Sequence, residues 1–195
     1  MGVPQRLPVF RRGLAVALVA LAAAGCAAAT VTPERVRPPE APSPTVAVGT
    51  VEAGPERWKR LVRFFRIGLV RRLRESEAFE VVLDPAPRDP PPGTIVVAGR
   101  ITDVDEGSEP ARLIIGLGFG RATVAGRFAV TAVGSEAEVV FEQRQASSSG
   151  NGQGAHWTPV TLEDLMETLG EETAETILRW RDGEALVRSP WQALW

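Results

Sequence analysis

The chain has 195 residues, and its 22 lysines and arginines nearly balance its 24 aspartates and glutamates. This charge balance does not favour nucleic-acid binding, and the length suffices for one domain with its own hydrophobic core. The single cysteine excludes a disulfide within the chain.

The first 25 residues have the pattern of a cleaved signal peptide. Three arginines and no acid come first, followed by GLAVALVALAAAG, which is too short to cross a bilayer as a stable helix. The small residues directly before Cys26 resemble the lipobox of bacterial lipoproteins. In that family the cysteine sulfur receives a diacylglycerol, and the chain is cut just before the cysteine. Because Ala23 stands where leucine is usual, ordinary secretion with cleavage after Ala22–Ala24 is the alternative.

Removal of residues 1–25 leaves 19 basic residues against 24 acidic ones, a net charge of −5. Residues 27–44 then hold five prolines, several charges and no apolar period. We therefore predict that residues 26–44 are a lipidated cysteine followed by an extended, hydrated tether. At about 3 Å per residue, such a tether would hold the domain a few tens of ångströms from the membrane.

From residue 45 to residue 185 the apolar pattern predicts a single domain, followed by a tail over 186–195. Strands are indicated by alternating or β-branched runs between turn residues, and helices by apolar residues at helical spacing. Thr161 and Asp164 form a capping-box pattern before the last helix. The predicted strands are 45–54, 80–84, 94–107, 121–132 and 136–146, and the predicted helices are 56–75 and 161–180.

The element order β-α-β-β-β-β-α predicts an α+β fold, a mostly antiparallel sheet with both helices on one face. The first helix carries eight basic residues and two acidic ones, and the last carries six acidic residues and one basic one. We expect the two helices to lie side by side, where these charges complement each other.

The stretch ARLIIGLGFGRA, residues 111–122, has glycines at positions 116, 118 and 120. A dinucleotide loop needs a further glycine and a helix directly after it, because the phosphates bind the amides of that helix's first turn. Here an alternating strand pattern follows instead. The glycines therefore predict a strand that a helix or another backbone can approach closely.

This stretch also carries a resemblance to a known family. Residues 99–130, GRITDVDEGSEPARLIIGLGFGRATVAGRFAV, resemble the bacterial lipoprotein family called domain of unknown function 4410. The similarity is expected to span 45–182. It implies an envelope lipoprotein with an α+β domain, and it implies no activity.

Nothing in the sequence assembles a nucleophile, a base and an oxyanion donor. The single histidine, His156, lies in a glycine-rich segment without a partner, and we expect a surface role for it. The acidic turn Asp103, Asp105, Glu106 and Glu109 lacks the ligand spacing of a calcium loop. We therefore predict no enzyme activity, no cofactor and no metal site.

The binding residues that we predict are arginines. Arg63 and Arg66 belong to the basic first helix, and Arg112 and Arg121 flank the glycine stretch, where they could bind an anion, cap a strand end or pair with the acidic turn. The basic helix either faces anionic lipid headgroups or is a solvated face partly neutralised by the acidic last helix.

Together these features predict a lipoprotein that is anchored in the membrane through Cys26 and lies in the cell envelope, at the outer membrane facing the periplasm. Its expected role is that of a non-catalytic accessory or scaffold subunit with an envelope protein as partner. The alternative is a module that binds a small amphiphile or lipid between helices and sheet.

Overall fold

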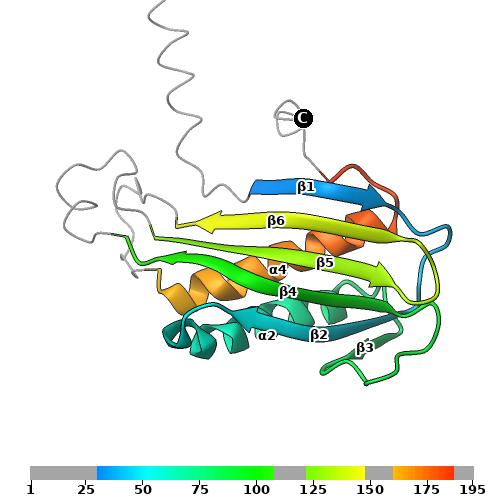
Figure 1. Cartoon of the computed structure of the whole chain (residues 1–195), viewed down its shortest axis with the longest axis horizontal. Coiled ribbons are helices and arrows are strands. Elements are labelled where there is room, and N and C mark those ends of the chain that lie inside the picture. Colours follow the sequence, from blue (N-terminus) through cyan, green and yellow to red (C-terminus); the bar gives the residue numbers. More distant parts are fainter. Residues whose placement is uncertain (1–29, 108–121, 148–159, 187–195) are drawn as a thin grey trace, which may run out of the picture.

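A computed structural model of the chain describes residues 30–107, 122–147 and 160–186 (Figure 1). These residues form one six-stranded sheet and two long helices. The strands are β1 (Thr30–Arg37), β2 (Thr45–Ala53), β3 (Val81–Leu83), β4 (Ile95–Asp105), β5 (Thr123–Ala132) and β6 (Glu138–Ala146), and the helices are α2 (Glu56–Glu75) and α4 (Leu162–Arg181).

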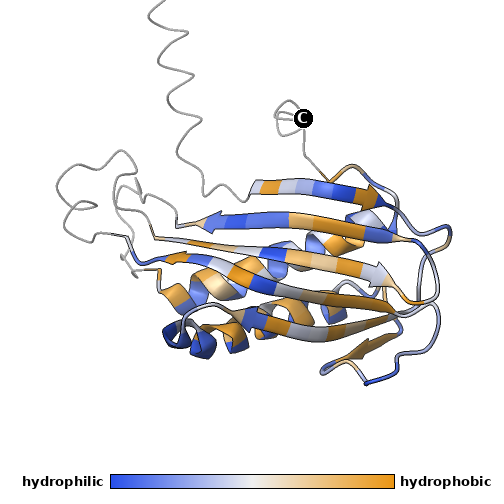
Figure 2. Cartoon of the chain, viewed as in Figure 1, coloured by the Kyte–Doolittle hydropathy of each residue, from blue (hydrophilic) through white to orange (hydrophobic). Residues whose placement is uncertain are grey.

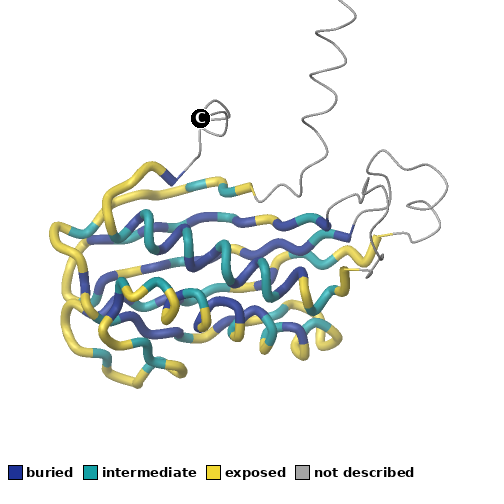
Figure 3. The backbone as a smooth tube through the Cα atoms, turned by 180° about the vertical axis from the view of Figure 1, so that it is seen from behind, coloured by how far each residue is buried: buried dark blue, intermediate teal, exposed yellow. Residues whose placement is uncertain are grey.

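The strands lie in the order β1-β6-β5-β4-β2-β3. Neighbours from β1 to β4 are antiparallel, whereas β2 runs parallel to both β4 and β3. The parallel pair β2–β3 follows from α2, because a helix after β2 returns the chain to the end of the sheet at which β2 began. Both helices cover the same face of the sheet, and buried residues line the surface between the two layers (Figure 3). The α+β prediction is confirmed, with a sheet that is mixed and mainly antiparallel.

The predicted elements agree closely with the observed ones. Helix α2 has the predicted bounds, and α4 begins after Thr161, whose hydroxyl caps the helix and whose backbone N–H donates to Asp164 in the predicted capping box. In β5 the residues predicted for the inner face, from Ala122 to Ala132 in steps of two, are all buried. The same alternation is visible as bands of hydropathy along the sheet (Figure 2).

One part of the sequence interpretation is wrong. Residues 30–37, assigned to a hydrated tether, form the edge strand β1, which pairs antiparallel with β6. Pro33 lies in this strand next to a register shift, a position that an edge strand tolerates because one side of it needs no hydrogen bonds. Residues 30–37 therefore belong to the sheet, and the domain does not begin at residue 45.

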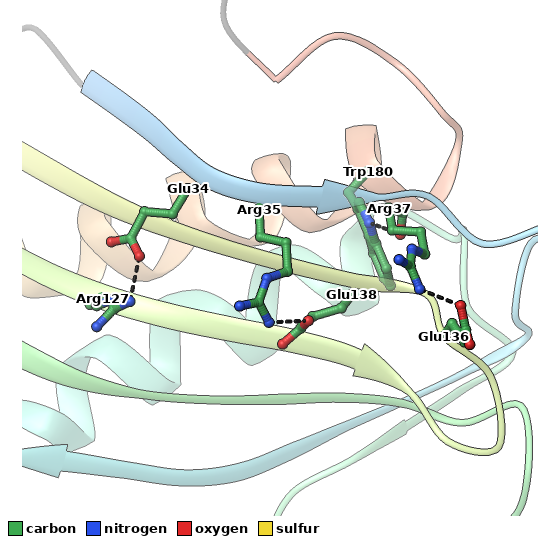
Figure 4. A network of polar contacts seen from close by, with 7 residues as sticks. All are labelled: Glu34, Arg35, Arg37, Arg127, Glu136, Glu138 and Trp180. Carbon is green, nitrogen blue, oxygen red and sulfur yellow. Dashed lines mark hydrogen bonds and ion pairs between the residues drawn. The ribbon is translucent and has the colours of Figure 1, made fainter.

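Side-chain contacts hold β1 in place (Figure 4). The Arg35 guanidinium donates to Glu138 at 2.8 Å, and Arg127 of β5 pairs with Glu34. At the end of the strand the indole N–H of Trp180, a buried residue of α4, donates to the backbone carbonyl of Arg37 at 3.0 Å. Helix α4 thus fastens β1 from beneath the sheet.

The core between sheet and helices is organised around Phe128. Its ring stacks on Phe65 of α2 with centroids 4.9 Å apart and contacts Phe141 of β6. A Cβ atom added at Gly99 or Gly126 would lie 2.4 Å from this ring. The ring therefore lies flat on a part of the sheet that has no side chains, and α2 packs directly on top of it.

The two helices meet through a pair of glycines. A Cβ atom at Gly68 would lie 2.0 Å from the carbonyl oxygen of Glu167, and one at Gly170 would lie 2.1 Å from that of Phe65. The backbones of α2 and α4 are in contact at this crossing. The predicted proximity of the basic and acidic helices is confirmed.

Candidate functional site

Two of the predicted binding residues, Arg63 and Arg66, lie on α2. Cys26, Arg112 and Arg121 lie outside the described residues, as do Glu109, His156 and the glycines at 116, 118 and 120. The candidate site is therefore built on α2, where the described residues also leave an open depression.

This depression runs along the outer side of α2, and we call it the basic groove. Its volume is about 610 Å³, and Asp84, directly after the short edge strand β3, forms its opposite side. The groove is lined by Arg63, Arg66, Ile67, Val70, Arg71, Arg74, Glu75 and Asp84. Four arginines thus stand around two apolar side chains and two carboxylates.

Arg66 is committed to the fold. Its guanidinium donates to the carbonyl oxygens of Gly49 at 2.8 Å and Val48 at 3.3 Å, and it pairs with Asp84. Val48 and Gly49 follow the part of β2 that pairs with β3. The Val48 carbonyl also accepts a hydrogen bond from the backbone N–H of Ala86 at 2.8 Å, so Arg66 and the segment after β3 together satisfy the carbonyls of this edge. The side chain closes this sheet edge and forms the wall of the groove.

Arg71 and Arg72 face the acidic helix. Arg71 pairs with Glu167 and Glu171, and Arg72 pairs with Glu175. The hydrogen bonds from Glu171 and then Glu167 raise the pKa of Arg71 above its ordinary value. This part of the basic face is neutralised by α4, as the second interpretation of the basic helix expects.

The remaining bases of α2 point to solvent. Arg57, Arg60, Arg63 and Arg74 are exposed and make no ion pair within the described residues. The Arg63 guanidinium lies 4.5 Å from the centroid of the Phe64 ring, which holds it at the surface. Arg63 and Arg74 stand at opposite ends of the groove, with Ile67 between them.

Ile67 and Val70 form the apolar part of the groove. Ile67 is 49% exposed, and Val70 is 8% exposed. Ile67 does not belong to the apolar face of α2 that packs on the sheet. This departure from the helical period is a signal visible in the sequence, but no prediction was based on it. Asp84 gave no such signal, because only the fold brings it beside α2.

The described residues offer no metal-binding group of three or more His, Cys, Asp or Glu side chains. In the acidic turn, the Asp105 carboxylate accepts a hydrogen bond from the backbone N–H of Gly107 at 2.8 Å. Within the described ranges no helix is long and apolar enough to cross a bilayer. What the groove can do chemically is bind: it offers guanidinium groups to an anion and an apolar floor to whatever the anion is attached to.

The chain belongs to the family described as "Domain of unknown function (DUF4410)", which matches residues 30–155. The match begins at the first residue of β1, so it includes the strand that the structure adds before residue 45. No curated protein matches the sequence.

The fold is similar to that of PelC from Paraburkholderia phytofirmans, solved as a dodecamer. A single-residue variant of PelC is 18% identical, with a TM-score of 0.47 and coverage of 74% of this chain and 93% of that one. A second PelC structure is 15% identical, with a TM-score of 0.47 and coverage of 74% and 94%. This level of similarity does not bear on the function of the present chain.

Proposed function

We propose that the protein is a lipoprotein of the cell envelope, anchored in the outer membrane through Cys26 and facing the periplasm. In this proposal it acts as a non-catalytic accessory or scaffold subunit, and the basic groove binds an acidic surface of an envelope protein. The observation that carries the anchor is the position of the only cysteine, directly after the apolar stretch and the small residues of a lipobox-like sequence.

The groove supports the binding role through its composition. Arginine presents a planar group that bonds carboxylates in a bidentate manner, and exposed apolar residues beside such groups are typical of protein interfaces. Arg63 and Arg74 are exposed, and Ile67 lies between them. An acidic segment with one apolar side chain would match this arrangement.

The anchor is tested by Cys26→Ser. We expect this variant to lose incorporation of labelled fatty acid and to move from the membrane fraction to the soluble fraction, since no thiol remains to be alkylated. Mass spectrometry of the mature wild-type protein should show an acylated cysteine at its amino terminus. Membrane association that is unchanged in Cys26→Ser, or a mature chain that starts beyond residue 26, contradicts the anchor.

The binding role is tested by charge reversal in the groove. With the double variant Arg63→Glu/Arg74→Glu, the amount of crosslinked partner recovered should fall at least tenfold, because both substituted side chains repel an acidic surface. The matched control is Arg60→Glu/Arg88→Glu, which changes the charge equally at two exposed positions that do not line the groove and make no ion pair within the described residues. Equal recovery of the partner with both variants rules the groove out as the docking surface.

A second candidate function, binding of a small anionic amphiphile, is favoured by the same apolar residues. The groove volume of about 610 Å³ lies in the range of small-molecule sites, about 300–1,000 Å³. In the described core, by contrast, the stacked Phe65 and Phe128 occupy the space between α2 and the sheet. Native mass spectrometry of the full chain should show a bound lipid that Ile67→Asp removes, if this candidate is right.

A further inference from the structure

We infer that the sheet stands upright on the bilayer, with the end at which β1 begins against the membrane surface. The inference rests on the proposed acylation of Cys26 and goes beyond it, because it names the surface of the domain that meets the lipid. The residues that carry it are the first residues of β1 and of α2.

The distance between anchor and fold is short. The sheet begins at Thr30, so only residues 27–29 separate Cys26 from a strand paired with β6. An extended chain advances at most about 3.6 Å per residue, so the α-carbon of Thr30 lies within about 14 Å of that of Cys26. The long tether expected from the sequence would have left the orientation free, whereas this short connection restricts it.

The sheet is much longer than this connection. β4 has 11 residues, which span about 36 Å at 3.3 Å per residue. The far end of the strands therefore cannot reach the membrane while the first residue of β1 stays near the anchor, unless the domain lies on its side. Most helices and strands begin or finish at the end of the sheet at which β1 begins.

Figure 1 shows which termini gather there. β1, β5 and both helices begin at this end, and β2, β4 and β6 finish at it. The first turns of α2 carry Arg57, Lys59 and Arg60, all exposed, and the half-buried Trp58. The Arg57 guanidinium lies 5.8 Å from the centroid of the Trp58 ring. Bases beside an indole suit the headgroup region of a membrane, because the ring is apolar and its N–H is polar.

Acidic side chains at the same end oppose a purely electrostatic attachment. Asp105 ends β4 and Glu106 follows it, and Glu163 and Asp164 lie in the first turn of α4. The strongly hydrophilic start of α2 is visible at the corner below β2 (Figure 2). The short connection therefore sets the orientation, and anionic lipid draws the α2 corner closer than the α4 corner.

The test places single thiol reporters in the full-length, acylated protein, whose own sulfur is then a thioether and does not react. Two matched pairs of positions compare the two ends. Arg60→Cys and Arg74→Cys lie on the same helix, and Glu106→Cys and Glu136→Cys lie after β4 and before β6. All four residues are exposed. Each labelled variant is reconstituted in phosphatidylethanolamine–phosphatidylglycerol vesicles that carry a short-range quencher on a fraction of their headgroups.

We expect at least twofold stronger quenching at residues 60 and 106 than at residues 74 and 136. Fifteen glycine and serine residues inserted after Ala28 should abolish this difference, because the domain can then turn freely. Equal or reversed quenching in a chain that mass spectrometry shows to be acylated overturns the orientation and leaves the proposed function standing. A reconstituted chain without acyl groups overturns the proposed function itself.

Discussion

Arg63 and Arg66 lie three residues apart on α2, and their guanidinium groups have different surroundings. Arg66 donates to the carbonyls of Gly49 and Val48 and pairs with Asp84, while Arg63 rests on the Phe64 ring at the surface. A guanidinium group has five hydrogen-bond donors. Arg66 uses its donors on backbone carbonyls of the sheet edge and on Asp84, whereas the donors of the exposed Arg63 remain available to a partner. Of the two predicted binding residues that the structure describes, only Arg63 has the geometry for recognition.

Asp164 supports a prediction at the same scale. Its carboxylate accepts hydrogen bonds from the backbone N–H of Thr161 at 2.9 Å and from the Thr161 hydroxyl at 2.8 Å, and these bonds lower the pKa of Asp164 from its ordinary 3.8. Because this pKa is lower in the folded state than in the unfolded chain, the ionised Asp164 carboxylate stabilises the fold at pH values above 3.8. This stabilisation is lost as the pH falls below that value. We expect Asp164→Ala to lower the free energy of unfolding by about 1 kcal/mol at pH 7.

The measurement is denaturant unfolding of the wild-type and variant proteins at pH 7 and at about pH 3. Glu163→Ala is the matched control, because it removes the neighbouring acidic residue in the same helical turn, outside the capping box. The difference in free energy of unfolding between wild type and Asp164→Ala should shrink at the lower pH more than the difference between wild type and the control. If the first difference does not change with pH, Asp164 stabilises the protein through packing and not through its charge.

At the scale of elements, the crossing of α2 and α4 depends on its glycines. Gly68→Ala would place a methyl group 2.0 Å from the Glu167 carbonyl oxygen, a distance that backbone atoms can relieve only if the helices separate. We expect a loss of about 3 kcal/mol in the free energy of unfolding, although alanine favours a helix over glycine by about 1 kcal/mol.

Gly54→Ala is the control for this prediction, because its Cβ would lie 3.6 Å from the Trp58 ring, an ordinary contact. Thermal unfolding followed by circular dichroism distinguishes the two. If Gly68→Ala is as stable as the wild type, the two backbones do not touch.

The elements also show which parts of the fold the sequence could predict. The limits of both helices are local: Pro55 precedes α2, and Thr161 and Asp164 form the cap of α4. The sequence does not predict β1, because half of its residues are charged or proline and its pairing with β6 bridges about a hundred residues of chain. Local pattern carries no record of so distant a partner.

Buried polar residues were equally invisible. Gln143 of β6 is fully buried, and its side-chain oxygen accepts a hydrogen bond from the Thr176 hydroxyl of α4 at 3.2 Å. In the sequence, Gln143 and Gln145 alternate with charged residues as a solvent face would. Their burial is set by the register with β5, which the helices then cover.

The candidate site was half predictable. The excess of arginine on α2 singles out Arg63 and Arg66, yet the groove exists because β3 ends early and places Asp84 opposite the helix. The neutralisation of Arg71 and Arg72 likewise requires α4 to lie beside α2. The composition of α2 identifies arginine as the binding residue type, and tertiary packing decides which of these arginines are free to bind.

At the scale of the whole molecule, the domain limit can be tested by truncation. A chain that begins at residue 45 lacks β1, which leaves the backbone groups of β6 unpaired and bares the Trp180 indole that donates to Arg37. A chain that begins at Thr30 keeps these contacts. We expect the shorter chain to lose roughly 3 kcal/mol or more, counting about 1 kcal/mol for the indole bond and the rest for lost strand pairs. For a domain of this size that corresponds to a fall of about 6–12 °C in Tm.

The shorter chain should also self-associate, because an uncovered edge strand pairs with other chains. Calorimetry measures the Tm of both chains, and light scattering measures their self-association. If both chains are monodisperse monomers with equal Tm values, residues 30–37 act as a linker and do not contribute to the stability of the fold.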